Sequence, residues 1–145
     1  MALKLFRVLW FVSVLLVVFN LLYIYAGLPF EVVVSEQGER VTVSRELLFY
    51  GMLAGVVLMN VLVYIFKYFY PQGEDFRAWF HGLLITFNIF CIVALWSLSV
   101  YNSLERFNPS LVTGYLLGSL GLSVIWAAGW PLYLLYQKIF VKATI

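Results

Sequence analysis

Charged side chains are scarce in this chain. Asp, Glu, Lys and Arg make up only 11% of its 145 residues, and the formal net charge is +2. An average soluble domain carries about 25% charged residues. Nucleic-acid-binding proteins need a basic patch or stripe, and the sequence has none outside its apolar runs. We therefore expect no nucleic-acid partner, and the low charge favours a membrane protein over a soluble one.

Metal-ligating side chains are equally few. The chain has one cysteine, Cys91, and one histidine, His81. A single cysteine cannot form an internal disulfide, and structural zinc sites need several cysteines or histidines. Haem needs an axial ligand in a defined pocket, and no second ligand lies opposite His81 at an obvious depth. We expect no metal and no cofactor, and we expect Cys91 to behave as a small buried hydrophobe.

Long apolar runs make up most of the chain. Hydrophobic residues make up 64% of it, and charge is nearly absent from four long runs, which cover Val8–Ala26, Leu47–Phe66, Ala78–Tyr101 and Leu111–Tyr136. Each run can cross a hydrocarbon layer of about 30 Å as a helix. The sequence predicts an all-α integral membrane protein, with a four-transmembrane-helix bundle forming one membrane domain. The helices are expected at about 8–26, 47–68, 77–101 and 110–137.

No Asp, Glu, Lys or Arg lies deep inside any of the four runs. Pumps, voltage sensors and proton-coupled transporters normally need such groups inside the membrane, so none of these functions is expected for the isolated chain. One chemically plausible cluster, near the second turn, contains Glu74, Asp75, Arg77 and His81. It suits either a solvated, helix-capping turn or a contact of Arg77 and His81 with a phosphate or lipid headgroup. It contains no complete catalytic set, and we expect that the protein is not an enzyme.

Lysine and arginine are distributed unevenly between the two ends of the predicted bundle. Six lie in the N-terminal tail, the second loop and the C-terminal tail, and three lie in the first and third loops. Cytoplasmic segments of multi-pass membrane proteins carry the excess of these residues. An even number of helices puts both termini on one side, so we expect both termini in the cytoplasm.

The first predicted outer loop differs from the rest of the chain. Two stretches rich in β-branched residues flank a polar turn around Gly38, which predicts a β-hairpin over about residues 30–44. An isolated two-stranded hairpin is marginally stable in water. It must therefore lean on the outer helix ends, on the membrane surface or on another protein. Its exposed edges also allow strand addition by a partner.

Local signals indicate where helices start and bend. Ser44 and Asp75 are expected to cap the second and third helices, and Asn108 or Ser110 the fourth. Pro131 lacks a backbone donor, so it is expected to kink the fourth helix just before it, near residues 127–129.

Small residues occur at helical spacing in two of the predicted helices. Gly51 and Gly55 lie four residues apart in the second helix, and the fourth contains Gly114, Gly118 and Gly121. Glycine at such positions lets another backbone approach closely in a membrane. We expect these residues to pack helices together, and we expect the fourth helix to be packed most tightly against its neighbours.

Two amides fall at matching depths of adjacent helices. Asn60 lies seven residues before Lys67, and Asn88 lies seven residues after His81. The two helices run in opposite directions from one turn, so both amides lie about 10 Å from that end of the bundle. They are expected to hydrogen-bond to each other and join the helices, although a polar spot for a ligand headgroup or a partner helix is the alternative. Asn20 lies farther out, with the same two interpretations.

Part of the first half of the chain resembles a known membrane domain. Leu28-Pro29, an extended stretch, Gly38-Glu39 and then Val43-Ser44-Arg45 before a helix are similar to a bacterial membrane domain of unknown function. That family includes the N-terminal part of the Sdp-type immunity proteins, and the likeness covers about residues 8–66. Val33-Val34-Ser35 replaces the family's usual His-Phe/Trp-Asn, so no site built on that motif is carried over. The resemblance implies a bacterial inner-membrane protein.

Two functions are compatible with the sequence. The first is a non-catalytic small subunit or scaffold of a larger bacterial inner-membrane complex. It would bind partner helices through its small-residue and aromatic faces, with lipids and other membrane subunits as its partners. The second is a stand-alone membrane sensor or immunity protein that contacts a peptide through its outer loop. The lack of ionic and catalytic groups favours the first.

Overall fold

The computed structural model describes residues 2–35, 41–69, 73–103 and 108–141. In chain order its elements are α1 (Ala2–Gly27), β1 (Glu31–Ser35), β2 (Val41–Ser44), α2 (Arg45–Phe69), α3 (Glu74–Tyr101), α4 (Pro109–Tyr136) and a short π-helix, η1 (Gln137–Val141). This order of helices and hairpin agrees with the predicted fold. The first helix begins at Ala2 rather than near residue 8. The expected turn around Gly38 lies outside the described residues.

All four helices are long and apolar enough to cross a membrane. They contain 26, 25 and 28 residues in α1, α2 and α3, and 32 residues from Pro109 to Phe140. At 1.5 Å per residue the shortest reaches about 37 Å, more than the roughly 30 Å of a hydrocarbon core. These are the features of a multi-pass membrane protein.

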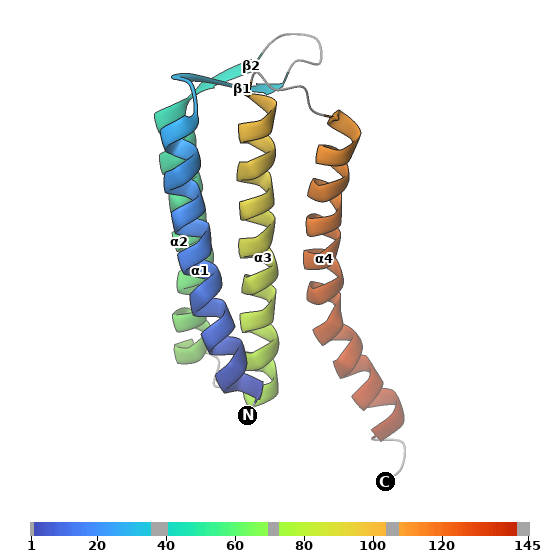
Figure 1. Cartoon of the computed structure of the whole chain (residues 1–145). Coiled ribbons are helices and arrows are strands. Elements are labelled where there is room, and N and C mark those ends of the chain that lie inside the picture. The colour runs from blue at the N-terminus through green and yellow to red at the C-terminus, as the bar shows by residue number, and fades with distance from the viewer. Residues whose placement is uncertain (1, 36–40, 70–72, 104–107, 142–145) are drawn as a thin grey trace.

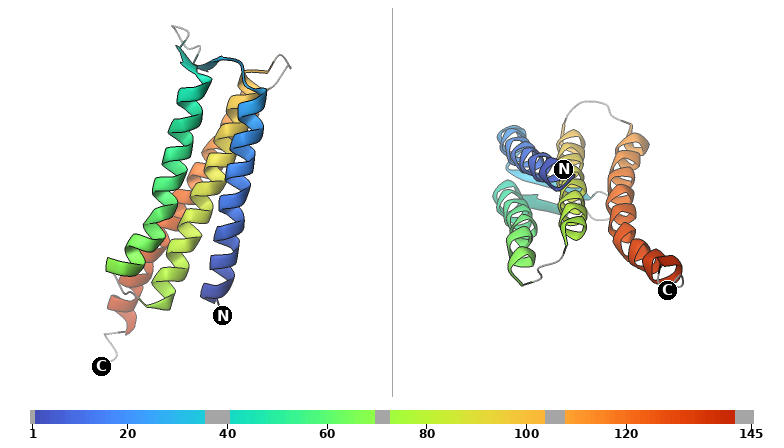
Figure 2. Two further views of the ribbon diagram at one scale, coloured as in Figure 1. Left: turned by 90° about the vertical axis from the view of Figure 1, so that its left-hand side faces the viewer. Right: turned by 90° about the horizontal axis from the view of Figure 1, so that it is seen from below.

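The helices form a three-helix group with one helix at its side. Figure 1 shows α1 and α2 on one side of α3, and α4 on the other side. Seen from below, α1, α2 and α3 make a triangle, and α4 borders it along α3 (Figure 2). The most extensive helix contact is between α1 and α3. Both termini lie at the end of the bundle opposite the hairpin, which we call the lower end, as it appears in Figure 1.

Buried apolar side chains fill the three-helix group along its length. An upper cluster is centred on Leu21, Ile24 and Leu95, and a middle cluster contains Val17, Val56 and Cys91. The lower cluster contains Val63, Phe80 and Leu84. Cys91 is buried in the middle cluster, which confirms its expected place as a small core residue.

The hairpin rests on the upper helix ends, which is one of the three supports expected for it. Asn102 follows the last turn of α3, and its side-chain amide pairs with the backbone of Val33 in β1. Val33 N donates to Asn102 Oδ1 at 2.7 Å, and Asn102 Nδ2 donates to Val33 O at 3.0 Å. The same Nδ2 also donates to Leu98 O at 2.9 Å. One side chain thus occupies the outer edge of β1 at Val33, where a third strand would otherwise pair.

Arg45 fastens the other side of the hairpin. Its guanidinium group lies over the rings of Tyr25 and Phe30, at 4.7 and 4.6 Å from their centroids. Nη1 donates to Leu28 O at 3.1 Å, and the backbone N of Arg45 donates to Phe30 O at 2.9 Å. Cation–π contacts of this kind contribute about 0.5–2 kcal/mol each. The start of α2 is therefore tied to the segment that joins α1 to β1.

The helix starts follow two of the three cap predictions. Ser44 Oγ accepts from Leu47 N at 3.2 Å, and Asn108 Oδ1 accepts from Ser110 N at 3.1 Å, so both residues act as caps. The predicted cap at Asp75 is wrong. The third helix already begins at Glu74, which leaves Gly73 at the cap position and Asp75 within the first turn.

The expectation that α4 is the most tightly packed helix is wrong. Of the 28 residues of α4 only Ser119 is buried, whereas ten residues of α3 are buried. The reason is position, because α4 borders α3 from outside the three-helix group (Figure 2). Figure 1 also shows that α4 bends in its C-terminal part and diverges from α3 there, in the region where Pro131 was expected to kink it.

Two tryptophans and one glycine join α4 to α3. Trp79 Nε1 donates to Trp126 O at 2.8 Å, and Trp126 Nε1 donates to Trp79 O at 2.9 Å, so each indole caps the other residue's carbonyl. Gly82 makes room for this arrangement. A Cβ at Gly82 would lie 2.3 Å from a ring carbon of Trp126.

We predict opposite effects for alanine at two helical glycines. Gly82→Ala overpacks the Trp126 ring, which cannot move without breaking its bond to Trp79, and should destabilise the protein by about 1–3 kcal/mol. Gly51→Ala is the control, because an added Cβ there meets no atom within 4 Å. It should instead stabilise α2 by about 0.5–1 kcal/mol. Thermal unfolding of both variants in the same detergent micelle checks this, and a Gly82→Ala protein as stable as Gly51→Ala would contradict it.

Candidate functional site

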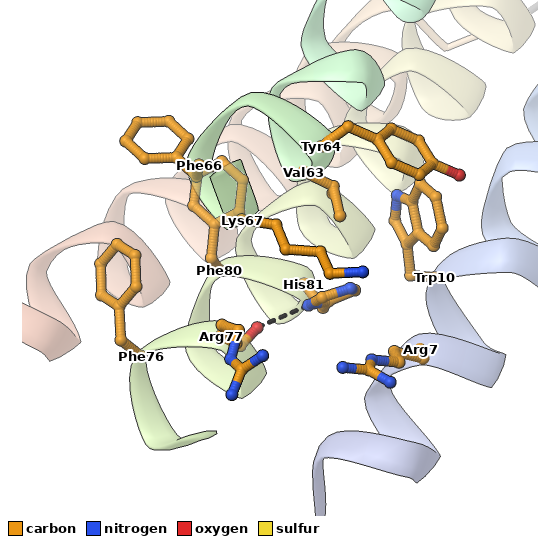
Figure 3. A pocket seen from close by; sticks show the side chains of 10 residues that line it. All are labelled: Arg7, Trp10, Val63, Tyr64, Phe66, Lys67, Phe76, Arg77, Phe80 and His81. Atoms are coloured by element: carbon orange, nitrogen blue, oxygen red, sulfur yellow. Dashed lines mark hydrogen bonds between the residues drawn. The ribbon is translucent and has the colours of Figure 1, made fainter. Parts of the chain in front are cut away.

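A cavity of about 230 Å³ opens at the lower end of the three-helix group. Ten residues line it, and they come from α1, α2 and α3 (Figure 3). Six are apolar or aromatic, and four carry basic groups; they are Arg7, Trp10, Val63, Tyr64, Phe66, Lys67, Phe76, Arg77, Phe80 and His81. The cavity therefore combines an apolar wall with a basic one.

Three permanent cations reach this cavity from three different helices. Figure 3 shows Lys67 of α2 extended toward the His81 ring, and Arg7 pointing from α1 toward the side of α3 that carries Arg77 and His81. No carboxylate is among the lining residues, and none of the three cations forms an ion pair with another residue that the structure describes. Arg77 Nε is buried and has no hydrogen-bond partner among the described residues. The positive charge of this cavity is thus uncompensated by the described part of the chain.

His81 forms the inner part of the basic wall. Its Nδ1 bonds to the carbonyl oxygen of Arg77, and because a carbonyl only accepts, Nδ1 carries the proton. Nε2 is the ring nitrogen left for a ligand. The side chain is only 5% exposed, and its ring meets Trp10 edge-on at 5.6 Å between centroids. Of the predicted cluster, His81 therefore does not lie on a solvated turn, because α1 covers it.

Trp10 is held in place from the other side by a buried amide pair. Asn60 Nδ2 donates to Asn88 Oδ1 at 2.9 Å, and Asn88 Nδ2 donates back to Asn60 Oδ1 at 3.2 Å. This confirms the predicted hydrogen bond between the two amides. Trp10 Nε1 donates to Asn60 Oδ1 at 2.8 Å, and Ser13 Oγ accepts from Asn88 Nδ2 at 2.9 Å. The pair thus extends to α1 and links all three helices.

Nearly every polar atom in this network has a partner. Asn60 Nδ2 makes its second bond to Val56 O at 2.8 Å, and Ser13 Oγ donates to Trp10 O at 2.7 Å. Both amides therefore use both of their N–H groups, and only one lone pair of Asn88 Oδ1 is left over. Asn88 is completely buried. The network has no donor left for a ligand, which favours its interpretation as a link between helices.

A second cavity, of about 370 Å³, lies on the α4 side of the bundle. It is lined by Asn20, Ile92, Val93, Trp96 and Tyr115. The Trp96 and Tyr115 rings meet edge-on across α3 and α4 at 5.8 Å. Asn20 Oδ1 is buried and has no hydrogen-bond partner among the described residues. Asn20 therefore differs from Asn60 and Asn88, since it accepts no bond within the described chain.

The glycines predicted to pack helices do not meet one another within the chain. An added Cβ at Gly51, Gly55, Gly114, Gly118 or Gly121 would find no atom within 4 Å. The glycine that α3 and α4 do use is Gly82, which the sequence analysis missed. The packing role of these five positions stays a prediction.

The structure brings the two predicted headgroup residues, Arg77 and His81, to the lower cavity, where Arg7 and Lys67 join them. Glu74 and Asp75 of the same predicted cluster are exposed and do not line it. Arg7 and Lys67 were missed as site residues. The signal that could have found them is their position, because both lie near the same predicted end of the bundle as His81.

Within the described residues no group of three or more His, Cys, Asp or Glu side chains is arranged to hold a metal ion.

Comparison with protein-family models, with curated proteins and with solved structures finds no match to this chain.

We predict that the two buried amides are energetically coupled. Asn60→Leu and Asn88→Leu should each remove the same two reciprocal hydrogen bonds, so the double variant should lose about 0.6–2 kcal/mol less than the sum of the single losses. Denaturant unfolding of the four proteins in micelles gives this coupling. Asn20→Leu is the matched control, because combined with Asn60→Leu it should be additive. Additive losses for Asn60→Leu and Asn88→Leu would reject the coupling.

Proposed function

We propose that this protein is a non-catalytic small subunit or scaffold of a larger bacterial inner-membrane complex, and that it binds partner helices. The observation that supports this most is the exposure of α4, because only one of its 28 residues is buried. Apolar exposure alone would carry little weight, because lipid tails are as apolar as leucine. The small residues of α4 are the stronger support.

Three glycines make one side of α4 unusually flat. Gly114, Gly118 and Gly121 follow each other at intervals of four and three residues, which places them on one helical face. Each would have open space around an added Cβ, so α3 does not cover this face. Small residues spaced in this way allow two helix backbones to approach closely, and packing of that kind drives helix association in lipid.

An unpartnered amide lies beside the same helix. Asn20 lines the second cavity together with Tyr115 of α4, and its buried Oδ1 has no partner among the described residues. An acceptor without a donor is costly in an apolar medium. A partner helix that carries a donor would satisfy it, for example through a serine or an amide.

Charge supports the proposed orientation. Both termini lie at the lower end in Figure 1, and so do Arg7, Lys67 and Arg77 around the cavity. Arg45 is the described arginine at the hairpin end. By the positive-inside rule, this distribution supports a cytoplasmic lower end with both termini.

The alternative, a sensor or immunity protein that binds a peptide by strand addition at the hairpin, has less support. The outer edge of β1 is already paired with Asn102, so a peptide would have to displace two hydrogen bonds there. The motif of the Sdp-type immunity proteins is also replaced in this strand by Val33-Val34-Ser35.

The test is assembly of the tagged full chain, purified from its native membrane in a mild detergent. We expect stoichiometric partner chains with the wild type and their loss with Gly118→Leu, because the added side chain holds two backbones apart. The Gly118→Leu chain itself should fold normally, since nothing lies near that position.

Leu120→Phe is the matched control. Leu120 is 46% exposed on α4, and at 100° per residue it points away from the face of the three glycines, so added bulk there should leave assembly intact. A wild-type chain that purifies alone as a small homogeneous species would overturn the proposal. So would full assembly of the Gly118→Leu protein.

A further inference from the structure

The lower cavity combines features that point to a phosphate-bearing ligand. Arg7, Lys67 and Arg77 direct three positive charges at one space from three helices. Like charges held together in a partly apolar site repel one another more strongly than in water, because the local dielectric constant is lower. The described chain supplies no counter-charge in the lining. An anion in the cavity would remove this repulsion.

The hydrogen-bonding state of Arg77 points the same way. Its side chain is half-buried, and its Nε is enclosed without a partner among the described residues. A guanidinium group has five donors in a planar fork that matches the oxygens of phosphate and carboxylate. A phosphate oxygen in the cavity would give this buried donor a partner. His81 lines the same space.

The size and the walls of the cavity limit what the phosphate is attached to. Pockets that enclose a drug-sized ligand measure roughly 300–1,000 Å³, and this cavity has about 230 Å³, which suits a headgroup rather than a nucleotide. The remaining walls are apolar, with Trp10, Phe66, Phe76 and Phe80 among them. Free phosphate gains nothing from such walls, whereas the glycerol and upper acyl carbons of a lipid do.

The position of the cavity along the bundle fits a lipid. Lys67 lies seven residues from Asn60 and His81 seven from Asn88, which places both about 10 Å below the amide pair, near the helix ends. Basic pockets between transmembrane helices at this level bind anionic headgroups. We propose that the lower cavity binds the phosphate group of an anionic phospholipid headgroup through Arg7, Lys67 and Arg77.

The test measures lipid retention by native mass spectrometry of the full chain. The protein is exchanged into micelles that contain equimolar phosphatidylglycerol and phosphatidylcholine. We expect one phosphatidylglycerol per chain, retained in preference to phosphatidylcholine. Each of Arg7→Gln, Lys67→Gln and Arg77→Gln should weaken this preference about five-fold. Lys67 and Arg7 are exposed, so their variants report on binding even if Arg77→Gln unfolds the protein.

Lys4→Gln and Lys138→Gln are the matched controls. They remove the same charge near the same end of the bundle, but neither residue lines the cavity. They should retain the wild-type preference. Equal losses in these controls would show attraction by the surface as a whole and would overturn the site, as would the lack of any preference in the wild type.

Inorganic phosphate in millimolar excess separates the two sources of the ligand. If it leaves the bound phosphatidylglycerol in place, the lipid is supported as the ligand. If it displaces the lipid from the wild type, the cavity is a site for free phosphate and the lipid assignment is overturned. These outcomes are independent of the proposed scaffold role, because they involve no residue of the α4 glycine face.

Discussion

The reciprocal amide bond between Asn60 and Asn88 is the constraint on which the arrangement of the three-helix group depends. In an apolar interior an amide that lacks partners is costly, so the two side chains must meet at one depth and one rotation of their helices. Apolar packing is more permissive, since a helix turned by one residue still offers leucine or valine. Trp10 and Ser13 extend the same requirement to α1. The network thus selects one register among several that packing would allow.

This register also shapes the lower cavity. The Trp10 side chain belongs to both features, because its Nε1 bonds to Asn60 while its ring faces His81 and lines the cavity. The antiparallel directions of α2 and α3 then bring Lys67 and His81 to the same level. The shape of the cavity therefore depends on the relative depth of the three helices as well as on the residues that line it. The packing of the helices keeps its basic groups close together without any bond between them.

Much of the fold follows from the sequence, because its signals are local. Apolar run length predicted four helices, β-branched stretches around a polar turn predicted the hairpin, and Ser44 and Asn108 mark helix starts through bonds within a few residues. The amide pair was also predictable, because two helices joined by a short turn have a known relative depth. The position of α4 outside the three-helix group was not predictable. The spacing of its glycines identifies a helix face, but it does not indicate which helix packs on that face.

The site was predictable only in part for the same reason. Arg77 and His81 are neighbours on one helix, so the sequence could group them, whereas Arg7 and Lys67 join them only through packing of three helices. Likewise, Gly82 carries no signal in the sequence that distinguishes it from other helical glycines. Its role comes from Trp126, which lies 44 positions away in the chain, on a different helix.

The burial of Cys91 has a practical consequence for measurements on this protein. The only thiol of the chain lies between α1, α2 and α3 with 4% of its surface exposed, so water-soluble maleimides and spin labels will not reach it in the folded state. The natural sequence therefore contains no thiol that such reagents would label in the folded protein. A cysteine introduced at either end of the bundle becomes the sole reactive position, and its accessibility from each face of a sealed vesicle reads out sidedness without any prior removal of native residues.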